Sequence, residues 1–311
     1  MADELRLNKP WLVAVWPGMG HVAISAGYYL MAKLGMHRLA EFSAEELFDV
    51  GHVDVKGGLI RTGRLPQSRL FVWNDPSRQR DLIVFIGEAQ PPLGKYVFCR
   101  RLIESARQLG VERVFTFAAM ATQMHPGDDS RVFGAATDEE SLVELKRLQL
   151  EILEDGHIGG LNGVLLGVAA EKGLHGACLL GEMPHMFAQL PFPKASLAVL
   201  KAFAAITGIS IDYTEMSEQA KHMDKELGKL MAQMEANAEQ QAPEPDEEET
   251  IQQEPSGDEG IGPDDREHIE QLFEQAGRDR SNAYELKREL DRLAVYKEYE
   301  DRFLDLFKKP G

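Results

Sequence analysis

The chain has 311 residues, 43% of them hydrophobic, and a formal net charge of -17 at pH 7, which is enough chain for one large α/β domain and a smaller unit. Eleven acidic residues and no Lys or Arg lie between Ala236 and Asp265, so the rest of the chain carries -6 and lacks the excess of positive charge typical of nucleic-acid-binding proteins. The longest apolar stretch, around Gly159 to Ala170, is too short and glycine-rich to span a bilayer, and the N-terminus has no apolar signal core, so we expect a cytoplasmic protein without a membrane partner.

Apolar, strand-like runs alternate with helix-like patterns from Trp11 to Gly208. Strands are predicted at Trp11–Trp16, Leu70–Asn74, Leu82–Gly87, Arg113–Ala118 and Ala177–Leu180. Helices are predicted at His21–Gly35, Lys95–Leu109, Asp138–Leu148, Gly160–Lys172 and Lys194–Gly208. This alternation predicts a doubly covered α/β sheet as the core domain, residues 1–211. The glycine-broken stretch from Glu41 to Arg69 predicts short antiparallel strands or turns.

The first predicted strand leads directly into a glycine turn, WPGMGHVAISAGYYL, at Trp16 to Leu30. Gly18, Gly20 and Ala23 fit a loose form of the dinucleotide-binding fingerprint, and Glu41 lies at about the distance expected of the ribose-binding acid. The region after Glu41, however, lacks the pattern of the parallel strand–helix–strand unit that such a site requires. We therefore favour an architectural turn, in which the glycines provide positive φ or close packing, over a phosphate site.

Two further segments place polar residues where ligands bind in open α/β sheets, outside the carboxyl ends of the strands. Glu88 and Gln90 lie in GEAQPP, at the end of a predicted strand, although Glu88 could instead bond to neighbouring loop backbone. Asn162, in GHIGGLNGVLLG, opens a predicted helix whose free N–H groups could face the same crevice or simply allow close packing. The candidate ligand crevice comprises Gly18, Gly20, His21, Glu88, Gln90 and Asn162.

The sequence has few other signs of catalysis or metal binding. Ser25 lies inside a predicted helix and not in a Gly-x-Ser-x-Gly elbow, and there is no Gly-x4-Gly-Lys-Ser/Thr loop. The nine histidines are scattered singly. Cys99 and Cys178 lie in apolar surroundings, which predicts buried, reduced thiols. We expect no catalytic residue, no metal and no cofactor.

After Ile211 the pattern changes to helices that need a packing partner. Apolar residues at alternating spacings of three and four predict an amphipathic helix, 212–236, whose apolar stripe is covered by the core, by the Leu286–Leu306 helix or by another subunit. Its candidate interface residues are Met216, Met223, Leu227, Leu230 and Met234.

The last part of the chain is predicted to contain a linker and a helical unit. Residues 237–263 are acidic and hold four prolines, so they are predicted to be a disordered linker. Apolar faces around Ile269 to Ala276 and from Leu286 to Leu306 predict a helical hairpin over residues 264–311.

Four segments in a fixed order resemble the proteasome assembly chaperone 2 (PAC2-like) family of bacteria and archaea, over roughly Leu12 to Gly208. They are WPGMGHVAISAGYYL, GEAQPP, GLNGVLLG and PFPKASLAVLKAF. The resemblance implies a three-layer α/β/α fold with a central mixed sheet, of the phosphorylase/hydrolase kind, and a tendency to form homo-oligomers. Archaeal members dock on proteasome rings through a C-terminal hydrophobic-Tyr-any-residue tail, whereas this chain ends in Leu306 to Gly311 without that motif.

Two functional hypotheses follow. The resemblance implies a non-enzymatic assembly chaperone or scaffold that forms a homo-oligomer, a trimer or tetramer, and binds a client protein complex such as a proteasome. The alternative is a nucleosidase- or phosphorylase-like hydrolase that acts on a small nucleoside-like ligand in the crevice.

Overall fold

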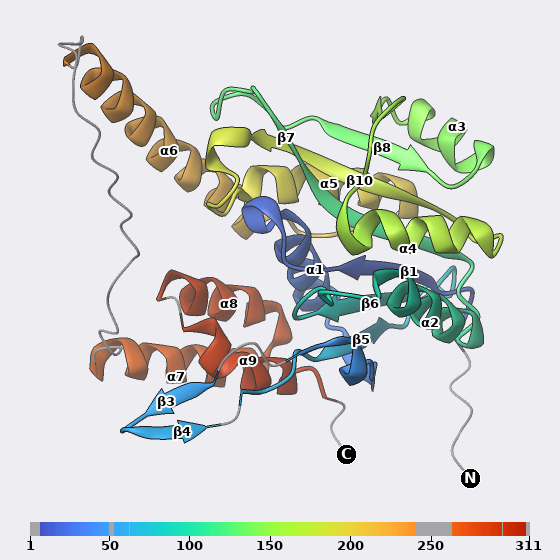
Figure 1. Ribbon diagram of the computed structural model, residues 1–311, viewed down its shortest axis with the longest axis horizontal. Coiled ribbons are helices and arrows are strands. Elements are labelled where there is room, and N and C mark those ends of the chain that lie inside the picture. Colours follow the sequence, from blue (N-terminus) through green and yellow to red (C-terminus); the bar gives the residue numbers. More distant parts are fainter. Residues whose placement is uncertain (1–6, 50–52, 62, 241–262, 294, 309–311) are drawn as a thin grey trace.

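The computed structural model describes residues 7–49, 53–61, 63–240, 263–293 and 295–308. Its centre is an eight-stranded sheet with the strand order β2-β5-β6-β1-β7-β10-β8-β9 (Figure 1). The strands are β1 (Trp11–Val15), β2 (His37–Glu41), β5 (Ser68–Trp73), β6 (Leu82–Gly87), β7 (Arg113–Thr122), β8 (Val132–Ala136), β9 (Glu151–Ile152) and β10 (His175–Pro184). The neighbours β6, β1, β7 and β10 are parallel, and β5 and β8 flank them in the antiparallel sense, so the sheet is mixed.

Helices cover both faces of this sheet. On one face α1 (Val22–Lys33) and α5 (Pro193–Thr207) share one buried apolar cluster. On the other face α2 (Lys95–Gln108) and α4 (Gly160–Glu171) share a second cluster. Helix α3 (Glu139–Arg147) packs beside β8, and Asp138 caps its first turn by accepting a hydrogen bond from the Ser141 N–H. The predicted three-layer α/β/α fold with a mixed sheet is therefore confirmed.

The predicted strands and helices of the core all occur, with ends that differ by a few residues. The sequence did not predict β2, β8 or β9, which lie toward the two ends of the sheet. The glycine-broken stretch forms a small separate hairpin, β3 (Asp54–Lys56) and β4 (Leu59–Arg61), as its pattern predicted. In the described part of the chain, no helix is both long enough and apolar enough to cross a membrane.

In the described part of the chain four α-helices follow the core, and all of them contribute to the α1 side of the molecule. Helix α6 (Thr214–Gln240) begins against α5 and then extends away from the sheet (Figure 1). Helices α7 (Pro263–Arg278), α8 (Ala283–Arg292) and α9 (Tyr296–Asp305) pack together, and their apolar residues join the buried cluster of α1 and α5. Most of the predicted acidic linker, residues 241–262, lies outside the described residues, as do residues 309–311.

The predicted helical hairpin at 264–311 is wrong in one respect, because its second helix is divided into α8 and α9. The Val295 N–H donates to the Leu290 carbonyl at 2.9 Å, which closes α8, and Val295 itself has φ -110 and lies outside the helix. After this break α9 folds back on α1, where Tyr296 and Phe303 both lie 5.7 Å from Tyr28 between ring centroids. Aromatic packing with the core therefore overrides a spacing that is compatible with one long helix.

Candidate functional sites

The parallel strands bring their carboxyl ends to one edge of the sheet, where the structure has a cavity of about 580 Å³. The chain leaves β1 toward β6 on one side and later returns to β7 on the other, and in open α/β sheets ligands bind at such a reversal. Of the six predicted crevice residues, Gly18, Gln90 and Asn162 line this cavity. Gly20, His21 and Glu88 do not.

The cavity, which we call the carboxyl-edge crevice, has a wall of small and apolar residues. Among the described residues that line it there is no Asp, Glu, Lys or Arg, and His157 is the single titratable side chain. Two polar atoms of its lining residues, Trp16 Nε1 and Asn162 Oδ1, are buried without a hydrogen-bond partner in the described part of the chain. The lining of the crevice therefore has few groups that could exchange a proton.

Gln90 caps helix α4 at the edge of this crevice. Its Oε1 accepts the Leu161 N–H at 3.0 Å and so caps the first turn of α4. The same side chain approaches Gly160, which has φ +68, so closely that a Cβ at Gly160 would lie 2.6 Å from Gln90 Oε1. A glycine is therefore required there, and the glycines of GHIGGLNGVLLG serve close packing at this position.

The turn after β1 is architectural at Gly20. This residue has φ +59, its N–H donates to the Ala188 carbonyl at 2.8 Å, and its carbonyl accepts the Phe192 N–H at 2.9 Å. A Cβ on Gly20 would lie 2.6 Å from Met183 Sδ. The turn is thus fixed to the segment after β10. Glu41, the candidate ribose ligand, ends β2 and pairs with Arg38, and β2 does not adjoin β1, so the structure does not have the dinucleotide-binding unit.

Glu88 lies in a buried ion-pair cluster between the sheet and α9. It accepts from Arg69 Nη1 at 2.8 Å and from the Gln67 N–H at 2.9 Å, so the alternative role in loop hydrogen bonding is the one that the structure has. Arg69 also donates to Asp301 at 2.7 Å. Burial and, secondarily, the Glu88 carboxylate raise the pKa of the neighbouring Glu300 above its usual value. The cluster holds α9 against the core, and Glu88 is not available in the crevice.

His21 lies on the opposite side of the turn and lines a second cavity of about 560 Å³, between the start of α1, α6 and α8. Lys287 is buried there, bonded to Asp291, with its Nζ 3.8 Å from the centroid of the Tyr296 ring. Burial lowers the pKa of Lys287, and the Asp291 carboxylate opposes this effect. No sequence pattern near His21 could reveal this cavity, because α8 comes from a distant part of the chain.

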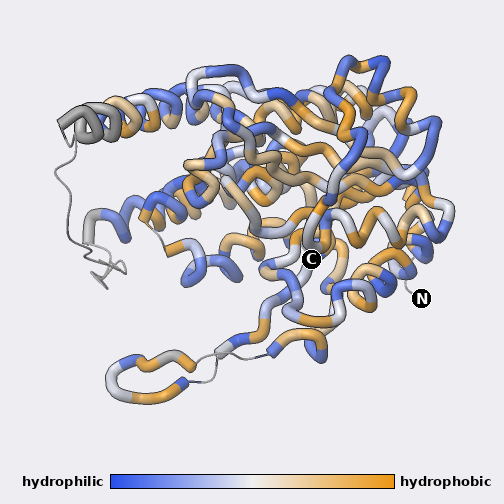
Figure 2. Tube along the Cα trace, turned by 45° about the horizontal axis from the view of Figure 1, so that its top comes forward, coloured by the Kyte–Doolittle hydropathy of each residue, from blue (hydrophilic) through white to orange (hydrophobic). Residues whose placement is uncertain are grey.

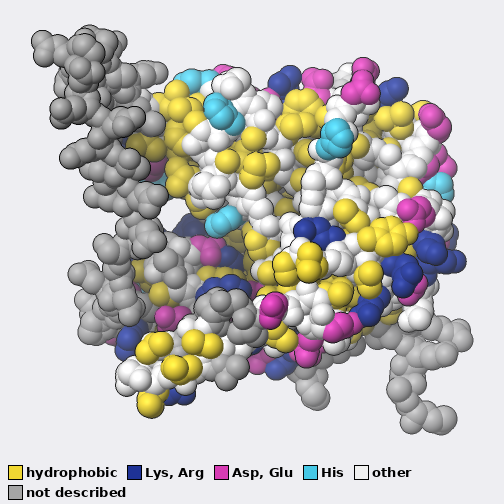
Figure 3. Space-filling model, viewed as in Figure 1, with side chains coloured by type: hydrophobic (Ala, Val, Ile, Leu, Met, Phe, Trp, Pro, Cys, Tyr) yellow, Lys and Arg dark blue, Asp and Glu magenta, His cyan; other side chains and the backbone are white. Residues whose placement is uncertain are grey.

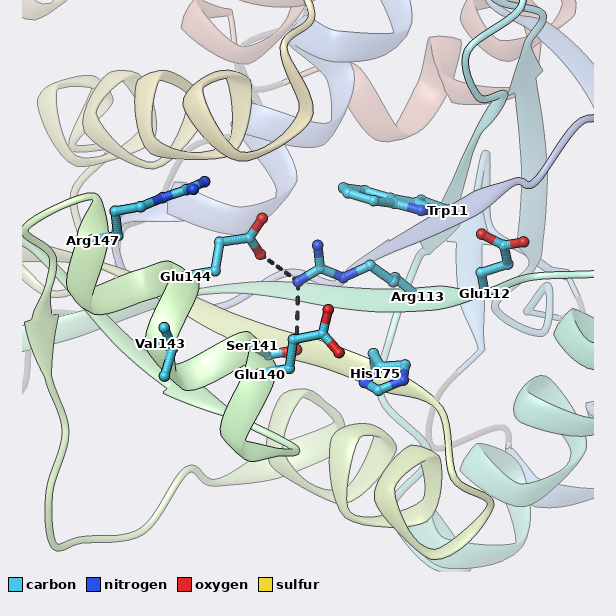
Figure 4. A pocket seen from close by; sticks show the side chains of 9 residues that line it. All are labelled: Trp11, Glu112, Arg113, Glu140, Ser141, Val143, Glu144, Arg147 and His175. Atoms are coloured by element: carbon cyan, nitrogen blue, oxygen red, sulfur yellow. Dashed lines mark hydrogen bonds and ion pairs between the residues drawn. The ribbon is translucent and has the colours of Figure 1, made fainter.

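A third cavity, of about 620 Å³, lies at the amino ends of β1, β7 and β10 (Figure 4). Two guanidinium groups pack on the Trp11 ring there, with Arg80 at 3.9 Å and Arg113 at 4.5 Å from the ring centroid. Arg113 points toward α3 and donates to Glu144 at 2.6 Å and to Ser141 at 3.4 Å (Figure 4). Because Arg113 is paired with a carboxylate and packed on Trp11, we interpret this arrangement as structural.

The predicted interface on α6 is largely covered within the single chain. Met216 and Leu227 are buried, Met223 is partly buried against the core, and Leu230 is 38% exposed. The side chain of Met234 lies outside the described residues. Of the surfaces expected to cover this helix, the α5 side of the core covers Met216 and Leu227, and contact of the helix with another subunit stays a prediction.

Apolar surface is instead exposed on the β3–β4 hairpin, which we call the arm and define as residues 53–61. It extends away from the body of the molecule in Figure 2, and Figure 3 shows apolar side chains on the side of the arm that is in view. The exposed residues are Val53 (50%), Val55 (67%), Leu59 (65%) and Ile60 (75%). The sequence prediction missed this surface because the short strands gave no indication of what would cover them.

Comparisons with known proteins support one family. The model of the PAC2 family matches residues 12–231. An archaeal proteasome activator from Pyrococcus furiosus is 26% identical, with a TM-score of 0.62, and the match covers 74% of this chain and 96% of that protein. A proteasome-assembly chaperone homologue from Mycobacterium tuberculosis shares the fold. It is 20% identical, with a TM-score of 0.61, and the match covers 71% of this chain and 94% of that protein. An uncharacterized protein of Methanocaldococcus jannaschii is 26% identical over 72% of this chain and 84% of its own length.

Proposed function

This chain belongs to the PAC2 family, and from that membership we propose that it is a non-enzymatic assembly chaperone or scaffold that acts as a homo-oligomer. Relatives of similar fold carry the descriptions proteasome activator and proteasome-assembly chaperone homologue. A proteasome-type ring is therefore the first client to test.

The composition of the carboxyl-edge crevice carries the non-enzymatic part of this proposal. An enzyme of this architecture would place its acid, base or nucleophile where the strands end. Two titratable candidates for that place lie elsewhere: Glu88 binds Arg69 at the α9 interface, and His21 faces α6 and α8. His157 is the single titratable side chain among the described lining residues, and the others are small, apolar or amide side chains, which suits a structural role of the fold better than proton transfer.

Reconstitution of the client tests the proposal. The tagged full-length chain is used to capture its complex from native extract, and the subunits of that complex are then separated and reassembled with and without purified chain. We expect the chain to raise the yield or rate of assembly and then to be recovered unchanged. An unrelated acidic protein of similar size serves as the control. Equal assembly in both samples would contradict the proposal.

The orphan polar atoms of the crevice favour a second candidate, a hydrolase that acts on a nucleoside-like ligand. The Trp16 indole N–H and the Asn162 amide oxygen would match the acceptor and donor of a base edge. A thermal-shift series with inosine, adenosine and inorganic phosphate separates the two candidates. A ligand at about 100 times its Kd stabilises the folded chain by about 2.7 kcal/mol. The chaperone proposal expects no such shift, whereas the hydrolase expects a shift that Trp16→Phe removes.

A further inference from the structure

The arm is a two-stranded ribbon with exposed apolar residues and open edges. Its sheet contains β3 and β4 and no other strand of the described chain. An isolated two-stranded hairpin is at best marginally stable in water, so one that exposes Val55 and Ile60 is expected to have a partner. Where the chain rejoins the body it is anchored, because Arg64 pairs with Glu88 at 3.3 Å and with Glu300 at 3.4 Å.

The turn of the arm determines which backbone groups face outward. Gly57 and Gly58 both have positive φ, 61° and 75°, and connect the paired residues Lys56 and Leu59, as in a two-residue type I′ hairpin. In such a hairpin the residues that flank the turn exchange their backbone hydrogen bonds with each other, and the next pair along does not. Val55, paired with Ile60, is in that next pair. Its N–H and carbonyl therefore point away from β4, toward the free edge of β3.

The charged residues of β3 are complementary to those of a second copy of β3 that pairs with it in the antiparallel direction. About a twofold axis at Val55, the N–H of each Val55 reaches the carbonyl of the other, and Asp54 of each copy stands opposite Lys56 of its partner. The same operation on β4 about Ile60 would place Leu59 opposite Arg61, without charge complementarity. The β3 edge is therefore the one that suits a second copy.

We propose that two copies of this chain associate through their arms, with β3 pairing antiparallel to β3 of the partner about Val55 to form a four-stranded sheet. Because Val55 and Ile60 are directly opposite each other, they share a face. Four apolar side chains, two from each arm, thus form one continuous strip across the two arms. This inference rests on the proposed homo-oligomer and deepens it, because a twofold contact builds dimers, or tetramers as pairs of dimers, and not trimers.

Charge exchange on the arm provides the first test, measured by sedimentation velocity over a range of concentrations. Lys56→Asp places acid opposite acid, and Asp54→Lys places base opposite base, so each variant alone is expected to lose the association. The double variant Asp54→Lys/Lys56→Asp restores opposite charges and is expected to recover it. An equimolar mixture of the two single variants is expected to form heterodimers. Unchanged association in both single variants would overturn the inference.

A cross-link provides the second test and locates the twofold axis. Across a hydrogen-bonded antiparallel pair the Cα atoms are about 5.5 Å apart, which is within the range of a disulfide. Val55→Cys is therefore expected to give a covalent dimer on mild oxidation, while the native Cys99 and Cys178 are buried. Ile60→Cys is the matched control, because Ile60 is at least as exposed on the arm as Val55 but lies one strand farther from the axis. Efficient cross-linking of Ile60→Cys but not of Val55→Cys would overturn the β3 pairing.

The outcomes separate the inference from the proposed function. Arm pairing is wrong if the parent chain is oligomeric, the charge variants associate as it does and Val55→Cys gives no covalent dimer. The subunits of the homo-oligomer then associate through another surface. If the parent chain is monomeric at every concentration, arm pairing and the homo-oligomer are both wrong. Client reassembly is measured separately and decides the chaperone role in either case.

Discussion

Substitution of Gly20 by alanine tests whether the turn after β1 is architectural. The residue has φ +59, a region in which a non-glycine residue costs about 1–2 kcal/mol. The new Cβ would lie 2.6 Å from Sδ and 2.7 Å from Cε of Met183, which is itself fully buried. Overpacking of this kind costs about 1–3 kcal/mol. We therefore expect Gly20→Ala to lower the free energy of unfolding by about 2–5 kcal/mol.

Gly18→Ala is the matched control in the same turn. Gly18 has φ -170, which is extended backbone open to any residue, and no atom lies within 4 Å of the position of its Cβ. We expect its free energy of unfolding to change by less than about 0.5 kcal/mol. Urea unfolding followed by tryptophan fluorescence measures both variants, with the midpoint as the observable.

The two contributions at Gly20 can be separated. Met183→Ala removes the atoms that the new Cβ would overlap and leaves the backbone strain in place. In a double-mutant cycle the combined loss is expected to be smaller than the sum of the single losses by about 1–3 kcal/mol. If Gly20→Ala unfolds at the midpoint of the parent chain, or if Gly18→Ala is affected as strongly, the architectural explanation is refuted.

Three further predictions follow from burial. Burial raises the pKa of Glu300, so its ionised form destabilises the folded chain, and this destabilisation is absent below the usual pKa near 4.5 and grows as pH rises above it. Glu300→Gln should therefore become more stable than the parent chain from pH 4.5 upward. Urea titrations at each pH measure this, and the variant at the exposed Glu298, Glu298→Gln, should show no such trend. Burial raises the pKa of both cysteine thiols to about 12, so a thiol reagent such as DTNB at pH 8 should react with neither cysteine until the chain is unfolded; rapid labelling of the folded chain would contradict this. Leu227→Ala should lower the free energy of unfolding by about 2–5 kcal/mol, because the Leu227 side chain is 2% exposed. Leu230→Ala should lower it by less than about 1 kcal/mol, because Leu230 is 38% exposed. Equal losses in the two variants would show that α6 does not pack as described.

The core could be predicted because its central strands are buried on both faces. β1 and β6 are buried at every residue, and such strands appear in the sequence as continuous apolar runs. Strand β2, in contrast, is partly exposed and reads HRLAE, and β9 has two residues, so neither gives a periodic signal. Edge strands depend on pairing with a neighbour that the local sequence does not contain.

The crevice could be predicted only where its residues depend on local chain geometry. Gln90 and Asn162 follow strands or open a helix, and the topology alone brings them to the carboxyl edge. Glu88 also follows a strand, yet its position is determined by Arg69 and by Asp301, more than 200 residues away. A local pattern can locate the end of a strand, but it cannot show which distant side chain will pair with a carboxylate there.

The C-terminal helices link these observations. The family match ends at residue 231, and α7, α8 and α9 lie after it. Two of the predicted crevice residues lie near them: Glu88 and Asp301 of α9 bond the same Arg69 side chain, and His21 and α8 line one cavity. The Arg69–Asp301 ion pair thus attaches α9 to the core. The described residues that line the crevice thus include no Asp, Glu, Lys or Arg, whereas the arm exposes apolar side chains, which is the kind of surface that marks an interaction site.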